Sequence, residues 1–140
     1  MARLLCASLL LLVCLMLPRS ANAAAPYVVG TWYGQGQPDD RDEMWLEHLL
    51  PNGGFDGLYR TCIKGKAQDL FQTGSWSLAG DMITIRIATI DGAPNPRTDL
   101  YRTLSRTGKK WTYRYLRLGF VYNAERVADN FQLYTCDAVS

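Results

Sequence analysis

The chain has 140 residues, of which 15 are basic, 13 are acidic and 48% are hydrophobic. Arg3 and Arg19 lie in an N-terminal segment with the pattern of an export signal, so residues 24–140 carry 13 charges of each sign. This balance excludes an extended basic surface of the kind that binds nucleic acid or anionic membranes. We therefore expect no nucleic-acid partner.

Residues 1–23 show the three parts of a secretory signal peptide. Arg3 precedes an apolar stretch over residues 4–17, and the small residues Ala-Asn-Ala at 21–23 are typical of a cleavage site. The apolar stretch is too short to span a bilayer. We predict a signal peptide over 1–23, one domain over 24–140, a periplasmic or secreted location and no membrane span after cleavage. The alternative is an uncleaved N-terminal anchor helix.

Two of the four cysteines, Cys62 and Cys136, lie in the predicted domain. An oxidising compartment favours their pairing, and the chain has no Cys-x-x-Cys redox motif. We predict a structural disulfide bond between them. Two buried free thiols or a redox pair are the alternatives.

Alternating apolar residues and turn signals predict about eight strands. These cover residues 27–35, 43–50, 55–63, 69–78, 82–90, 98–105, about 109–117 and about 120–127. The first connection, over 37–43, and the fifth, over 91–97, contain proline and are predicted to be loops. The last segment, over 119–136, fits a strand from Phe120 to about Val127, and it also fits a tail that contains Phe131 and Leu133. The pattern predicts an all-β domain, a single up-and-down antiparallel β-barrel, with a compact sandwich as the alternative.

A Gly-x-Trp sequence, Gly30-Thr31-Trp32, lies in the first predicted strand. It resembles the signature of the lipocalins and the wider calycin group, whose barrels also carry an arginine near the last strand that packs across the tryptophan. Arg126 is the matching residue in this chain. The resemblance implies a calycin-type barrel in which Gly30, Trp32 and Arg126 are structural residues. In outline the chain is most similar to small lipocalin-like proteins exported by Gram-negative bacteria, a group that implies a fold and a compartment but no activity.

The same strand also resembles the first strand of the avidin family at Gly30-Thr31-Trp32-Tyr33. In that family an asparagine that binds biotin follows shortly after the tripeptide. Gly34 stands at that place here, and the family's later serine, tryptophan and aspartate contacts have no match. The departure argues against biotin as the ligand.

The predicted inner wall combines large aromatic rings with a few polar groups, which suits a small apolar or amphipathic ligand. The predicted ligand-binding residues are His48, Tyr59, Gln72, Trp76, Trp111, Tyr113 and Tyr115. The same side chains could instead fill a packed barrel core. We expect a non-catalytic binding protein. The alternative is an interaction module or hydrolase inhibitor that contacts an envelope protein through the loops at 39–43 and 91–97.

No catalytic or metal motif is complete. His48 is the only histidine and has no nucleophile motif beside it, so we expect no enzyme activity, although a His48–tyrosine pair is the one arrangement an enzyme could use. The acidic residues between 39 and 43 do not have the spacing of a calcium loop, and no metal or cofactor is expected. Arg114 is predicted to point outward. Arg117 is predicted at the barrel mouth, where it is either solvated or a contact for an anionic group.

Overall fold

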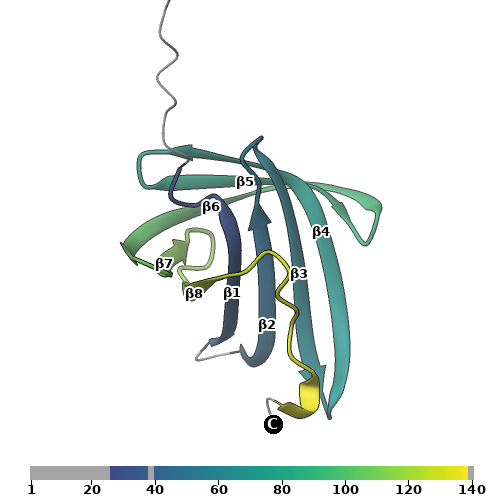
Figure 1. The fold of residues 1–140 in the computed structure, drawn as a ribbon. Coiled ribbons are helices and arrows are strands. Elements are labelled where there is room, and N and C mark those ends of the chain that lie inside the picture. Colours follow the sequence, from purple (N-terminus) through teal and green to yellow (C-terminus); the bar gives the residue numbers. More distant parts are fainter. Residues whose placement is uncertain (1–25, 38–39, 139–140) are drawn as a thin grey trace, which may run out of the picture.

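The computed structural model describes residues 26–37 and 40–138, in which eight antiparallel strands close a barrel (Figure 1). Each strand pairs with the next, and the last pairs with the first, which confirms the predicted up-and-down barrel. The strands are β1 (Gly30–Gln37), β2 (Asp40–Leu49), β3 (Gly54–Ile63), β4 (Lys66–Ala79), β5 (Met82–Ile90), β6 (Ala93–Thr107), β7 (Lys110–Tyr115) and β8 (Val121–Val127). A short 3-10 turn, η1 (Cys136–Ala138), follows.

The signal peptide predicted over 1–23 lies outside the described residues. Within the described ranges, no helix combines the length and apolar character that crossing a bilayer requires.

Two predicted loops are shorter than the sequence suggests. The prediction of a loop over 91–97 is wrong. Asp91 and Gly92 alone make the turn, both with positive φ, and β6 begins at Ala93. Pro94 and Pro96 fit this strand because β7 pairs with β6 only from Tyr101 onward, so the start of β6 has one open edge that needs no N–H donor.

The loop at 39–43 is also shorter than predicted, since β2 begins at Asp40 and includes Asp42 and Glu43. Asp39 lies outside the described residues. Short hairpins therefore connect most of the strands.

The barrel interior is filled at one end only. The core there consists of Val28, Trp32, Leu49, Phe55, Trp76, Ile83, Ile85, Ile87, Trp111, Tyr113 and Ala124. These residues come from the starts of the odd-numbered strands and the ends of the even-numbered ones, which meet at the same end of an up-and-down barrel. The opposite end is the barrel mouth.

The Arg126 side chain closes the filled end, as the family resemblance predicted. Its guanidinium lies over the Trp32 ring, 4.3 Å from the ring centroid, and donates hydrogen bonds of 2.5 Å to the carbonyl oxygens of Tyr27 and Val29. The Trp32 indole N–H donates to the Val28 carbonyl over 2.8 Å. Gly30 leaves room for this arrangement, because an added Cβ would overlap the guanidinium.

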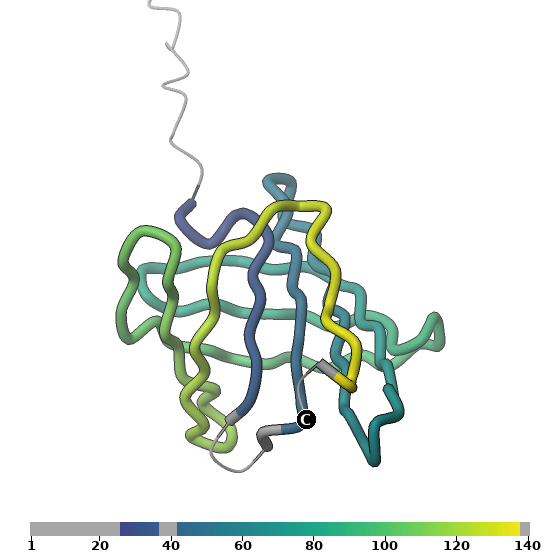
Figure 2. Tube along the Cα trace, turned by 60° about the horizontal axis from the view of Figure 1, so that its bottom comes forward, coloured from purple at the N-terminus to yellow at the C-terminus, as the bar shows by residue number. Residues whose placement is uncertain are grey.

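The C-terminal segment, residues 128–138, crosses the outer faces of β1, β2 and β3 (Figures 1 and 2). Thr31 of β1 donates a hydrogen bond of 2.7 Å to Asp129. Leu133 packs with Met44 and Leu46 of β2 in a second apolar cluster outside the barrel. Strand β2 is therefore covered on both faces.

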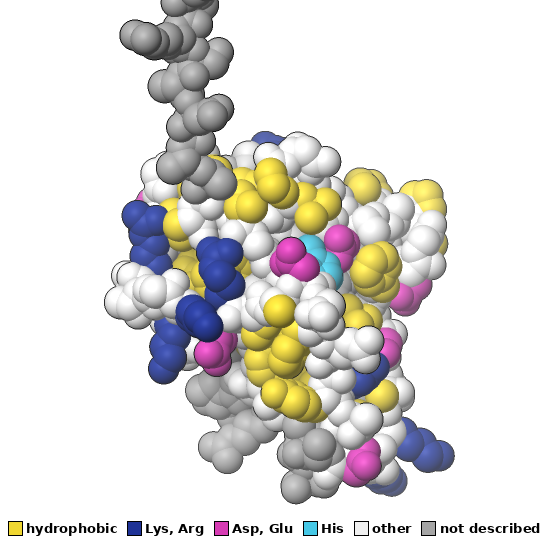
Figure 3. Space-filling model, in the orientation of Figure 1, with side chains coloured by type: hydrophobic (Ala, Val, Ile, Leu, Met, Phe, Trp, Pro, Cys, Tyr) yellow, Lys and Arg dark blue, Asp and Glu magenta, His cyan; other side chains and the backbone are white. Residues whose placement is uncertain are grey.

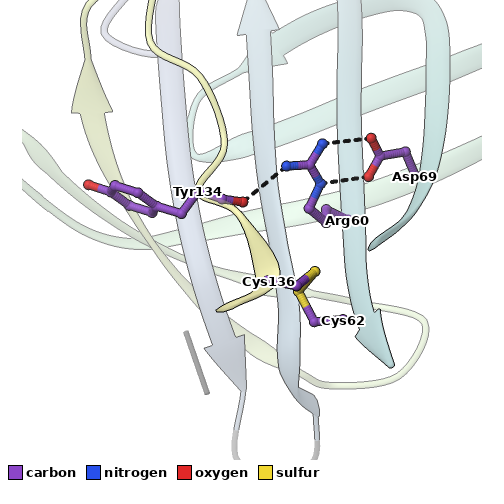
Figure 4. A network of polar contacts seen from close by, with 5 residues as sticks. All are labelled: Arg60, Cys62, Asp69, Tyr134 and Cys136. Carbon is purple, nitrogen blue, oxygen red and sulfur yellow. Dashed lines mark hydrogen bonds and ion pairs between the residues drawn. A yellow bond between two sulfur atoms is a disulfide. The ribbon is translucent and has the colours of Figure 1, made fainter. Parts of the chain in front are cut away.

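The end of this segment is attached to β3 by a polar contact and a covalent bond (Figure 4). Arg60 donates to the Tyr134 carbonyl over 3.0 Å and holds both carboxylate oxygens of Asp69 at 2.7 Å. Beside it Cys62 and Cys136 form the predicted pair, with Cα atoms 5.4 Å apart. The expectation that these two cysteines pair is confirmed.

We predict that Gly30→Ala lowers the free energy of unfolding by roughly 3 kcal/mol, since alanine strains the backbone at φ 135° and displaces the Arg126 guanidinium. Gly80→Ala is the matched control, because Gly80 also has positive φ but open space around it. It should lose only about 1 kcal/mol. Urea unfolding measures both, and equal losses would show that the guanidinium tolerates the added methyl group.

We predict that the Cys62→Ser, Cys136→Ser double variant unfolds at lower urea concentration than the oxidised protein. The bond joins positions 74 residues apart, and a loop of this length is worth about 4 kcal/mol through its effect on the unfolded chain. Reduced wild-type protein is the control and should match the double variant. An unchanged midpoint in both would contradict a stabilising role for the bond.

Candidate functional site

A cavity of about 350 Å³ occupies the mouth half of the barrel. Its wall includes four tyrosines from four different strands, Tyr59, Tyr101, Tyr115 and Tyr122. Tyr101 and Tyr115 stack with their ring centroids 5.1 Å apart. A volume of this size lies at the lower end of the range for small-molecule sites. The cavity therefore has room for one small ligand.

Polar side chains lie between the rings. Gln72 is 6% exposed and lines the cavity from β4. Asp99 is 2% exposed and accepts hydrogen bonds from Arg97 Nε at 3.0 Å and from the Tyr115 hydroxyl at 2.8 Å. Burial raises the pKa of Tyr115, and its hydrogen bond to Asp99 adds to this effect. The Asp99 carboxylate thus holds two groups of the wall in fixed positions.

Glu47 lies deeper inside the barrel, directly behind Tyr59. The Tyr59 hydroxyl donates a hydrogen bond of 2.7 Å to Glu47 Oε1, and the Tyr113 hydroxyl also interacts with the carboxyl group. Burial raises the pKa of Glu47, and the two hydroxyl contacts oppose this only in part. The barrel therefore encloses a carboxyl group among aromatic rings.

The negative charge of Glu47 also affects the neighbouring tyrosines. Burial raises the pKa of Tyr59, Tyr101 and Tyr113 well above the ordinary value, and the Glu47 charge adds to the shift at all three. Their hydroxyl groups consequently stay protonated at neutral pH and remain hydrogen-bond donors.

The structure divides the predicted ligand-binding residues between cavity and core. Tyr59, Gln72 and Tyr115 line the cavity. Trp76, Trp111 and Tyr113 belong to the packed end, where the indole N–H groups of the two tryptophans donate to the Leu50 carbonyl at 2.9 Å and to Thr103 Oγ1 at 3.1 Å. The structure thus places three of these residues at the cavity wall and three in the packed core.

The placement of His48 on the inner wall is wrong. His48 shares the outer face of β2 with Met44 and Leu46, and its Nδ1 lies 2.5 Å from Asp56 Oδ1. The prediction chose this face because it also carries the apolar residues Met44, Leu46 and Leu50. Met44 and Leu46 are buried under the C-terminal segment, which no local pattern reveals.

A second hollow of about 350 Å³ lies outside the barrel next to His48, with Thr31, Asp56 and Asp129 in its wall. On this face, acidic and histidine side chains lie beside apolar ones (Figure 3). Thr31 donates to Asp129, so the hollow lies where the C-terminal segment is linked to β1.

The sequence reasoning missed Glu47, Asp99 and Tyr101. Two signals could have found them. Glu47 alternates with Trp45 and Leu49, both of which are buried, and an acid in such a row indicates an inward carboxyl group. Asp99 and Tyr101 alternate in the same way along β6.

Over residues 26–37 and 40–138, no cluster of three or more histidine, cysteine, aspartate or glutamate side chains has the geometry to hold a metal ion. Comparisons with protein-family models, with curated proteins and with solved structures found no match.

We predict that Glu47→Gln stabilises the protein more at pH 7 than at pH 4. The folded protein keeps the Glu47 proton to higher pH than the unfolded chain does, so wild-type stability falls as the pH rises from the ordinary glutamate pKa through the raised one. Glutamine removes this titration. Glu125→Gln, on an exposed side chain of β8, is the control and should leave the pH dependence intact. Urea unfolding between pH 4 and pH 8 measures the difference, and parallel curves for wild type and Glu47→Gln would show that the carboxyl group is solvated.

Proposed function

We propose that this protein is an exported, lipocalin-like barrel that binds a small amphipathic molecule in its mouth cavity without transforming it. The cavity ringed by Tyr59, Tyr101, Tyr115 and Tyr122 is the observation that carries the proposal. Tyrosine rings offer apolar area, and their hydroxyl groups supply the few directed hydrogen bonds that orient a ligand.

The two ends of the barrel support a binding role in different ways. The filled end is rigid because large side chains pack there around Trp32 and the Arg126 contact. The mouth half keeps its volume because its inward positions carry rings at the wall and Gln72 and Asp99 between them. A ligand therefore enters at the mouth and stops above the packed core.

The location and the family likeness belong to the same proposal. The signal-peptide pattern over 1–23 and the paired Cys62 and Cys136 support export to an oxidising compartment. The contact between Trp32 and Arg126 supports the calycin-type likeness.

A second candidate is an interaction module that binds an envelope protein. The turn between β7 and β8 favours it, since Leu116, Leu118 and Phe120 are 38%, 58% and 42% exposed beside the mouth. Under this candidate, Leu118→Asp abolishes binding to a partner and leaves small-molecule binding intact. Under the cavity proposal, the same substitution leaves the ligand affinity unchanged within about twofold.

We predict that Leu70→Trp weakens binding of the neutral fluorescent probe N-phenyl-1-naphthylamine by about tenfold or more, because Leu70 lines the cavity and an indole group would occupy part of it. Phe71→Trp is the matched control, since Phe71 is the next residue along β4 and is 42% exposed on the outer face. It should leave the affinity unchanged.

Probe fluorescence titration measures both variants, and their thermal unfolding shows that they fold. Equal affinity of the Leu70→Trp and Phe71→Trp variants would sink the proposal, because the probe would then bind outside the barrel. Absence of any binding by the wild-type protein would have the same consequence.

A further inference from the structure

The mouth cavity has an excess of negative charge. Among the described residues of its wall, Glu43 and Asp99 are acidic and Arg97 alone is basic. Arg97 is already committed to Asp99, with Nε and Oδ2 3.0 Å apart. Glu47 adds a third carboxyl group behind Tyr59. A ligand in the cavity therefore meets more negative charge than positive.

The basic side chains near the mouth do not reverse this balance. Arg97 is 41% exposed, so solvent screens its guanidinium, whereas Asp99 is 2% exposed. Arg117 acts on Tyr115 from the turn between β7 and β8. It lies at the rim, where long basic side chains extend into water. The deeper part of the site is the more negative part.

The tyrosine rings add to the same preference. The faces of aromatic rings carry negative potential and attract ammonium groups, with a gain of about 0.5 to 2 kcal/mol per contact that rises as water is removed. The Tyr59 hydroxyl donates a hydrogen bond of 2.7 Å to Glu47, so this carboxyl group lies directly behind one of the rings of the cavity wall. An anion would meet repulsion from the same groups.

We propose that the cavity selects a ligand with a positively charged amine, held by the rings of Tyr59, Tyr101, Tyr115 and Tyr122 and by the carboxylates of Glu47 and Asp99. This inference rests on the proposed binding function and gives its ligand a charge. The apolar part of the ligand packs against the rings and Leu70, and the ammonium group points toward Asp99, the buried carboxylate of the cavity wall, with Glu47 behind Tyr59. A volume of about 350 Å³ limits the ligand to a small amine.

The test uses three probes with one phenyl group and similar length: phenethylammonium, phenethyl alcohol and hydrocinnamate. Isothermal titration of the wild-type protein at pH 7 should give an affinity for phenethylammonium at least about tenfold above that for the alcohol, with hydrocinnamate weakest. Leu70→Trp should weaken all three, which places them in the cavity.

Single carboxyl groups are then removed without change of shape. Glu47→Gln and Asp99→Asn should each lower the affinity for phenethylammonium by about five- to tenfold and leave that for phenethyl alcohol within about twofold. Glu125→Gln, on the exposed outer side of β8, is the matched control and should change neither. Asp99→Asn keeps the test available if Glu47→Gln does not fold.

The outcomes separate the two proposals. Binding of the alcohol or of hydrocinnamate as tightly as phenethylammonium, still weakened by Leu70→Trp, overturns the selection for amines and leaves the cavity function standing. Failure of all three probes and of the neutral fluorescent probe to bind contradicts the cavity function. Tighter binding of phenethylammonium that does not change in Glu47→Gln or Asp99→Asn also overturns the inference.

Discussion

The barrel depends on the pairing of its last strand with its first. The Arg126 guanidinium, which lies over the Trp32 ring, stabilises this pairing. An eight-stranded sheet closes only if β8 pairs with β1. The paired residues are nearly a whole domain apart in sequence. Arg126 binds the carbonyl groups of Tyr27 and Val29 just before β1 and stacks on the ring that follows. The Arg126 side chain thus positions both the segment before β1 and strand β8. The same contact requires glycine at position 30, because an added Cβ would overlap the Arg126 guanidinium.

This closure separates a packed half from a hollow half. Isoleucines and tryptophans fill the end near Trp32, where apolar side chains need no polar partner. At the mouth the inward positions carry tyrosines, Gln72 and Asp99, and Tyr115 donates a hydrogen bond to Asp99 on the neighbouring strand β6. This bond between adjacent strands holds both side chains at the wall and leaves space at the centre. The same residues that keep the cavity open give it its negative character, since their partners include Glu47 and Asp99.

The C-terminal segment covers the outer face of β2, so both faces of this strand are buried. A strand with one dry face shows a simple alternation, but β2 packs Trp45 and Leu49 inward and Met44 and Leu46 outward under Leu133. Both faces are therefore apolar, and periodicity alone could not choose between them. This is why His48 was predicted inside and lies outside, and why Glu47 was overlooked. At β6 the two prolines suggested a loop, whereas the pairing with β5 continues past them because the other edge is open.

The sequence by itself determined the features that depend on neighbours along the chain. These are the number of strands, the alternation within each strand, the hairpin turns, and the pairing of the only two cysteines of the domain. It also identified Trp32 and Arg126 as partners, through the family resemblance. Tertiary structure alone decided which face of β2 points inward, how far the packed core extends, and that Asp99 and four tyrosines from different strands surround one cavity, with Glu47 behind Tyr59. The reason is physical: a side chain's environment depends on contacts between strands far apart in sequence, and local periodicity carries no record of them.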